Sequence, residues 1–126
     1  MMMRLRLSAA ILCASSAAQA ADGSLCGRQV SSISDLLIQM QSPTVEALGR
    51  DTRMFAFRDT ADATYWVFSV KNTSAHPAVI CAREIDEAGA KRVETGIDCK
   101  ADDKICQSFT EMALAQIDKH RAGDRN

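Results

Sequence analysis

The sequence predicts an α+β fold in which a four-stranded antiparallel meander sheet has an N-terminal amphipathic helix and a C-terminal helix packed on one of its faces. Three observations predict it. Segments rich in aromatic and β-branched residues alternate with turn-forming residues in the middle of the chain, and apolar residues at helical spacing lie on both sides of them. Four cysteines follow an export signal, so two disulfides are expected to brace the domain.

Residues 1–20 have the features of a cleavable secretory signal peptide. A basic start precedes an uncharged apolar run over 7–18, and the small residues Ala18 and Ala20 stand at the −3 and −1 positions of a cleavage site. The apolar run is barely over half of the about 20 residues that a membrane span requires. We therefore expect cleavage before Ala21 and no membrane span.

A lipid anchor is the other alternative for the N-terminal region, at Cys13 or Cys26. Each of these cysteines follows a leucine, whereas a bacterial lipidation motif has Gly, Ala or Ser at that place. Neither cysteine is a good lipidation site. The expected product is a soluble periplasmic or secreted protein with a single domain over 21–126.

The charge of the processed chain argues against nucleic acid as a partner. The full chain of 126 residues has 15 basic and 16 acidic residues, and loss of Arg4 and Arg6 leaves 13 basic residues and a net charge of −3. The remaining basic residues alternate with acidic ones along the sequence. No basic patch of the kind that neutralises phosphates is expected.

Four cysteines remain after cleavage, and four cysteines allow three disulfide pairings. Cys99 and Cys106 are separated by six residues that read as a strand end and a first helical turn, so a short link between them is favoured. Cys26 and Cys81 then form the second pair. The alternative is a metal or redox site, but the chain has no C-x-x-C motif. We expect neither a metal nor a cofactor.

The first expected element is a short amphipathic helix over 31–41. Its apolar residues recur at i, i+3, i+4 and i+7, which is one face of a helix. They are Ile33, Leu36, Leu37 and Met40. Ser32 followed by Asp35 supplies a capping signal. The dipeptide Ser42-Pro43 is expected to open one or two further helical turns over 45–48.

Four strands are expected next, in two hairpins. They cover residues 54–58, 64–70, 78–84 and 91–98. Polar residues 59–63 form the first turn, and the tetrad 86–89 forms the second. In the second strand Trp66 and Phe68 share one face, and Tyr65, Val67 and Ser69 share the other. Trp66 and Phe68 are predicted to lie in the core.

The last expected element is the C-terminal helix. Asp102 and Asp103 suit its positive N-terminal end. The apolar stripe of the helix consists of Ile105, Phe109, Met112 and Ala113. His120 lies among basic residues that suit the negative C-terminal end, and Gly123 is expected to end the helix.

The candidate binding surface is on the second strand. If the helices cover only one face of the sheet, Tyr65 and Val67 form an exposed aromatic patch, with Arg58 and Arg83 beside it. Aromatic and arginine side chains are favoured at binding surfaces. The alternative is that the N-terminal helix covers this patch.

Catalytic motifs are sparse in the sequence. The chain has no G-x-S-x-G nucleophile turn, and its acidic residues fall at predicted turns and strand ends. His76, in the loop between the hairpins, is the one candidate for chemistry. We expect a non-catalytic binding protein of the bacterial periplasm or exterior with a protein partner, such as an inhibitor, an immunity-type protein or an envelope accessory protein. The alternative is a small exported enzyme or metal-handling protein using His76.

Overall fold

The computed structural model describes residues 18–19 and 23–124. The predicted signal peptide, 1–20, therefore lies outside the described residues except for Ala18–Gln19. The elements are β1 (Ala18–Gln19), β2 (Ser24–Leu25), β3 (Arg28–Gln29), α1 (Ile33–Gln39), β4 (Val45–Arg50), β5 (Met54–Asp59), β6 (Thr64–Ser69), β7 (Ala78–Glu87), β8 (Ala90–Cys99) and α2 (Asp103–Asp124).

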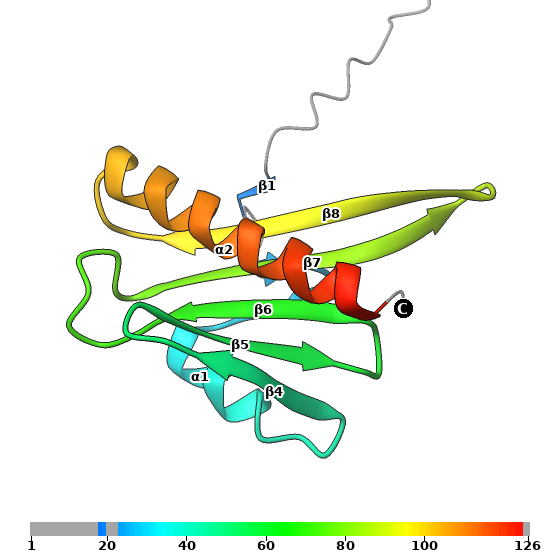
Figure 1. The fold of residues 1–126 in the computed structure, drawn as a ribbon, viewed down its shortest axis with the longest axis horizontal. Coiled ribbons are helices and arrows are strands. Elements are labelled where there is room, and N and C mark those ends of the chain that lie inside the picture. Colours follow the sequence, from blue (N-terminus) through cyan, green and yellow to red (C-terminus); the bar gives the residue numbers. More distant parts are fainter. Residues whose placement is uncertain (1–17, 20–22, 125–126) are drawn as a thin grey trace, which may run out of the picture.

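The main sheet has the strand order β1-β8-β7-β6-β5-β4, so consecutive strands from β4 to β8 are neighbours (Figure 1). These five strands form an antiparallel meander, and β1 pairs with β8 in parallel. The four predicted strands correspond to β5, β6, β7 and β8, and the α+β class is confirmed. The expected number of four strands is wrong, because β4 adds a fifth to the meander.

Strand β4 lies where one or two helical turns were expected. The backbone N–H of Val45 donates to the carbonyl of Ser42, at 3.0 Å, which closes a turn with Pro43 at its second position. Pro43 therefore begins a chain reversal and not a helix. The chain then pairs with β5, and a β-bulge between Ala47 and Gly49 places Leu48 against the core on the α2 side.

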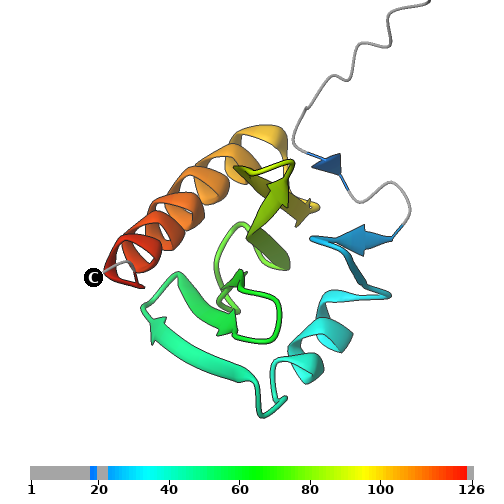
Figure 2. The same ribbon diagram turned by 90° about the vertical axis from the view of Figure 1, so that its right-hand side faces the viewer.

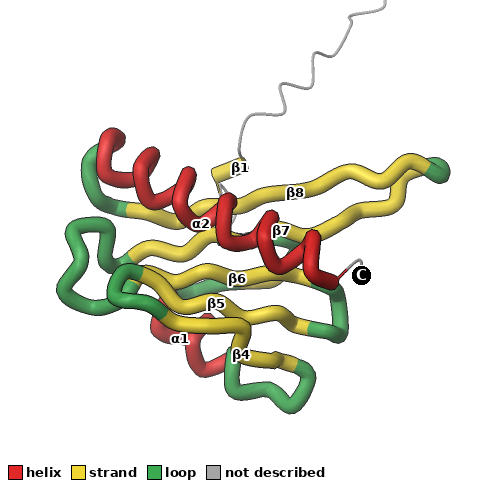
Figure 3. Tube along the Cα trace, viewed as in Figure 1, coloured by secondary structure: helices red, strands yellow, loops and turns green. Residues whose placement is uncertain are grey.

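The expectation that both helices pack on one face of the sheet is wrong: α2 and α1 cover opposite faces, so the molecule has three layers. Figure 2 shows α2 along one face and α1 with the β2–β3 hairpin against the other, and Figure 3 shows the same helices as red coils beside the yellow strands. Every residue of β6 is buried. Trp66 and Phe68 belong to the core cluster under α1 and β2, while Tyr65 and Val67 belong to the cluster under α2. The predicted division of β6 into two faces is confirmed.

Both predicted disulfides are present, Cys26–Cys81 and Cys99–Cys106. The first joins the β2–β3 hairpin to the central strand β7, with 6.3 Å between the Cα atoms. Gly96 lies opposite Cys81 in β8, and a Cβ at Gly96 would come within 2.9 Å of the Cys81 Sγ and 3.0 Å of a Leu25 methyl. The hairpin can approach the sheet this closely only because residue 96 has no side chain.

The two helices have the N-terminal caps that their sequences suggest, but α2 continues through Gly123, so the expectation that Gly123 ends it is wrong. The Ser32 hydroxyl accepts the backbone N–H of Asp35 at 3.0 Å and begins α1, which has seven residues. The Asp102 carboxylate accepts the N–H of Ile105 at 3.0 Å and begins α2, as predicted. Within the described residues, neither helix is long and apolar enough to cross a membrane.

A partly buried ion pair anchors the N-terminal segment on the sheet. The Arg28 guanidinium lies 5.2 Å from the centre of the Trp66 ring and 2.7 Å from the carboxylate of Asp59. Asp59 is 4% exposed and also accepts a 2.7 Å hydrogen bond from the Thr44 hydroxyl. Arg28 therefore closes the layer over Trp66, and Asp59 fixes the turn that leads into β4.

Candidate functional site

The expected surface at Tyr65 and Val67 is not open. Tyr65 is 6% exposed and Val67 is fully buried, because α2 packs over this face of the sheet. The expectation of an exposed patch there is wrong, and so is the alternative in which the N-terminal helix covers it. The N-terminal helix lies on the opposite face, and the C-terminal helix is the cover (Figure 2).

The two arginines predicted beside that surface lie on different faces. Arg58 is opposite Tyr65 in the β5–β6 pair, with its guanidinium 5.8 Å from the Tyr65 ring and 3.3 Å from the Glu46 carboxylate. Arg83 is opposite Thr64, so it projects from the Trp66 face, where it lies against Gly27 and pairs with Glu94 at 3.3 Å. The structure brings Arg58 and Tyr65 together and separates Arg83 from them.

His76 is exposed in the β6–β7 loop, next to a structural hydroxyl. Its Nδ1 lies 3.0 Å from the Ser69 Oγ, which also accepts the backbone N–H of Ala78 at 2.9 Å. The described part of the chain contains no group of three or more His, Cys, Asp and Glu side chains placed to hold a metal ion. The contacts of His76 within the described residues fix the loop at the start of β7.

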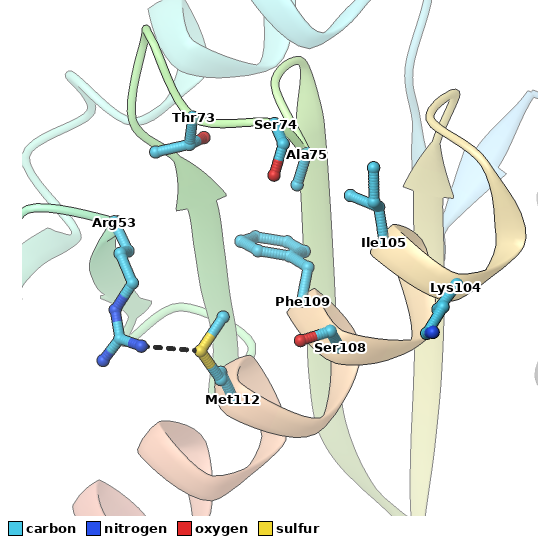
Figure 4. Close-up of a pocket in the computed structure, with 9 residues that line it drawn as sticks. All are labelled: Arg53, Thr73, Ser74, Ala75, Lys104, Ile105, Ser108, Phe109 and Met112. Atoms are coloured by element: carbon cyan, nitrogen blue, oxygen red, sulfur yellow. Dashed lines mark hydrogen bonds between the residues drawn. The ribbon is translucent and has the colours of Figure 1, made fainter.

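A different part of the surface has the form of a binding site. A groove of about 500 Å³ lies between the first three turns of α2 and the loops at one end of the sheet. We call it the α2 groove. It is lined by Arg53, Thr73, Ser74, Ala75, Lys104, Ile105, Ser108, Phe109 and Met112 (Figure 4). Its volume is within the range of small-ligand and side-chain pockets.

The α2 groove combines an apolar floor with cationic ends. Figure 4 shows the Phe109 ring in the middle, with Arg53 and Lys104 on opposite sides of it. The Arg53 guanidinium lies 3.1 Å from the Met112 sulfur. Arg53 interacts electrostatically with the Asp51 carboxylate, which does not line the groove. Every charged residue that lines the groove is therefore a cation, in a processed chain whose expected net charge is negative.

Three independent constraints hold the walls of the α2 groove. On the Arg53 side, Asp51 accepts the backbone N–H groups of Arg53 and Met54 at 2.7 and 2.9 Å. These two hydrogen bonds lower the pKa of the Asp51 carboxyl. The carboxylate is thus ionised at neutral pH and fixes the turn from which the Arg53 side chain extends.

Hydrogen bonds and a disulfide hold the other two walls of the α2 groove. In the β6–β7 loop, the Thr73 hydroxyl donates to the carbonyl of Val70 at 2.7 Å, and the His76 N–H donates to the carbonyl of Thr73 at 3.2 Å. The Cys99–Cys106 disulfide ties the first turns of α2 to the end of β8. The backbone of the groove walls is thus held in place, which limits the entropic cost of binding.

Comparison of the chain with the models of known protein families, with curated proteins and with solved structures gave no match. The case for the site therefore consists of its geometry and charge.

The sequence identified the apolar stripe of α2 but not the groove at its N-terminal end. Helix α2 has 22 residues and is about 33 Å long, which matches the ten-residue strand β7 on which it packs. The length of the helix therefore gave no signal of the groove, which forms only where the fold brings the loops beside Ile105, Phe109 and Met112.

Proposed function

We propose that this protein is an exported, non-catalytic binding protein whose α2 groove takes an apolar side chain flanked by carboxylates on a partner protein. The observation that carries the proposal is the arrangement of Arg53 and Lys104 on opposite sides of the Phe109 ring. An apolar partner side chain in the groove is removed from water by the apolar lining as a whole, since Phe109 itself is only 3% exposed, and an acidic residue on each side of it meets a cation.

Export is supported by the signal-like residues 1–20 and by two disulfides, which persist in oxidising compartments such as the periplasm. The partner is proposed to be a protein of the periplasm or cell exterior. The proposed classes are an inhibitor, an immunity-type protein or an envelope accessory protein.

Affinity capture from an envelope extract tests the proposal, with three processed baits compared side by side. We expect the unmodified protein to retain a stoichiometric partner that the Arg53→Glu/Lys104→Glu variant loses. The matched control is Lys91→Glu/Lys119→Glu, which makes the same change in charge at two exposed positions outside the groove.

A partner captured equally by the groove variant and by the control would contradict the proposal, because binding would then depend on another surface. Intact mass and circular dichroism of each bait confirm that processing, disulfides and fold are unchanged.

A further inference from the structure

The outer edge of β8 is a second surface, besides the α2 groove, on which another chain could bind. Strand β8 lies at the margin of the meander, and among the described residues the edge that faces away from β7 is paired only with β1, through Ala18 opposite Gly96 and Gln19 opposite Ile97. The edge of β8 therefore has the geometry to accept an added strand. Cleavage after residue 20, as proposed above, removes β1 and leaves a ten-residue strand with unpaired backbone groups.

The opposite margin of the sheet differs from the β8 edge. Strand β4 is shorter, and a bulge at Leu48 interrupts its register. Short and bulged edge strands resist pairing with another strand. Strand β8 pairs with β7 over its whole length without a register shift. Helix α2 packs on β5, β6 and β7 and meets the end of β8 at the Cys99–Cys106 disulfide, while Val93 on the same face of β8 is 42% exposed.

We propose that the processed protein forms a symmetric dimer in which the β8 strands of two copies pair antiparallel, with Thr95 opposite Thr95 of the second copy. A two-fold axis perpendicular to the sheet keeps the α2 faces of the two copies on the same side. Residues directly opposite each other in an antiparallel pair point to the same face, so both have odd numbers or both have even numbers, and the sum of the two numbers is even. That condition restricts the register to centres on single residues.

Charge then selects among the possible centres near the middle of β8. A centre at Glu94 places two glutamates opposite each other, and a centre at Gly96 places Glu94 opposite Asp98. Like charges directly opposite are destabilising. The centre at Thr95 has no such pair, and it places Arg92 of each copy opposite Asp98 of the other.

The same register also covers an exposed apolar side chain. Val93 is 42% exposed and is one of two large apolar residues that the described structure leaves open. With the centre at Thr95, Val93 lies opposite Ile97 of the second copy on the α2 face of the sheet. Two such pairs, two ion pairs and the new backbone hydrogen bonds would join the meanders into one continuous sheet.

Charge reversal at this register is the test, using chains processed in an exporting host. We expect the mass of the unmodified protein, measured by light scattering, to reach twice that of one chain as the concentration is raised to about 1 mM. Arg92→Asp and Asp98→Arg should each return it to the mass of one chain. The combined Arg92→Asp/Asp98→Arg variant should recover the dimer, because it restores opposite charges across the axis.

The combined variant also separates this proposal from a defect in folding. Arg92 pairs with Glu87 at 2.7 Å within the chain, and the combined variant loses that ion pair as the single variant does. Recovery of the dimer must therefore come from the second copy. Lys119→Asp, on the exposed side of α2, should leave the dimer unchanged.

A processed protein that keeps the mass of one chain at every concentration would overturn the proposal, as would a combined variant that stays a monomer. A chain that is exported without cleavage, identified by its intact mass, would overturn both the dimer and the processing step of the proposed function. A processed monomer that still captures a partner through the α2 groove would overturn the dimer alone.

Discussion

At the scale of single residues, the Asp59 carboxylate joins more parts of the molecule than any other side chain described above. It lies at the end of β5, beneath Arg28 of the N-terminal hairpin, and it accepts hydrogen bonds from Thr44 and from the backbone N–H of Ala61. Burial opposes its ionisation, but the hydrogen bonds from Arg28, Thr44 and Ala61 outweigh burial and hold the pKa below its usual value.

The lowered pKa of Asp59 predicts a dependence of stability on pH. Because the folded pKa is below the unfolded value of about 3.9, the contribution to stability is complete above that value and is lost as the pH falls through the folded pKa. Asp59→Asn should lower the free energy of unfolding by about 2 kcal/mol at pH 7 and flatten its decline in acid. Urea denaturation between pH 7 and pH 2 measures both effects.

Asp62→Asn is the matched control for Asp59. Asp62 also pairs with Arg28, at 3.3 Å, but its side chain is 36% exposed. The variant should change stability by less than about 1 kcal/mol at pH 7. Equal effects of the two substitutions would contradict a special role for the buried carboxylate.

Arg28 is expected to be irreplaceable by lysine. Its guanidinium stacks over Trp66 and bonds Asp59 at the same time. An ammonium group is a compact charge and cannot present both a flat face and a hydrogen-bonding edge. Arg28→Lys should therefore lower the melting temperature nearly as much as Arg28→Ala, and thermal denaturation followed by circular dichroism checks this. A lysine variant as stable as the parent would show that charge alone suffices.

At the scale of elements, the two disulfides close loops of very different length. Cys26 and Cys81 are 55 residues apart, and Cys99 and Cys106 are 7 apart. In the chain-entropy treatment the first stabilises the fold by about 4 kcal/mol and the second by about 2.5 kcal/mol. The Cys26→Ser/Cys81→Ser variant should thus lose more stability than Cys99→Ser/Cys106→Ser in urea denaturation. The reverse order would contradict this assignment of roles.

The two pairs should also differ in what their loss exposes. Removing Cys26–Cys81 frees the hairpin that covers Trp66, so quenching of tryptophan fluorescence by acrylamide should increase. Removing Cys99–Cys106 acts on the start of α2 and should leave Trp66 shielded. Since the chain has one tryptophan, the signal reports on this layer alone.

Strands β5 to β8 and helix α2 could be predicted because their signals are local. Alternating apolar residues, turn residues and a capping aspartate all act within a few positions. Strand β4 could not be predicted in the same way, since Val45–Arg50 has little alternation and Ser42-Pro43 suits both a helix start and a turn. Its pairing with β5 decides its structure.

The prediction of an exposed surface at Tyr65 and Val67 was wrong for a related reason. The alternation of β6 assigns Tyr65 and Trp66 to opposite faces, but it does not show which helix covers either face. The nearly continuous apolar run over 65–68 is nevertheless typical of a strand buried on both sides. The α2 groove depends on three segments that are distant in sequence, so only the fold brings Arg53 beside Met112.

At the scale of the whole molecule, the three layers bury the central strand β6 on both faces, and the proposed binding features lie at the margins of the sheet. The α2 groove opens at the loop end of the sheet, and the edge of β8 is the site of the proposed dimer contact. A partner in the groove and a second copy at β8 would use separate surfaces (Figures 1 and 4).

The central claim is that the α2 groove binds an apolar side chain flanked by carboxylates. Fluorescence anisotropy tests it most directly, with a labelled peptide in which leucine stands between two glutamates and a second peptide with glutamines instead. We predict that the unmodified protein binds the glutamate peptide saturably and binds the glutamine peptide with at least about tenfold lower affinity. Arg53→Glu/Lys104→Glu should lower the affinity for the glutamate peptide by at least about tenfold, and Lys91→Glu/Lys119→Glu should leave it unchanged. Equal affinity for both peptides, or binding that the groove variant leaves intact, would contradict the claim.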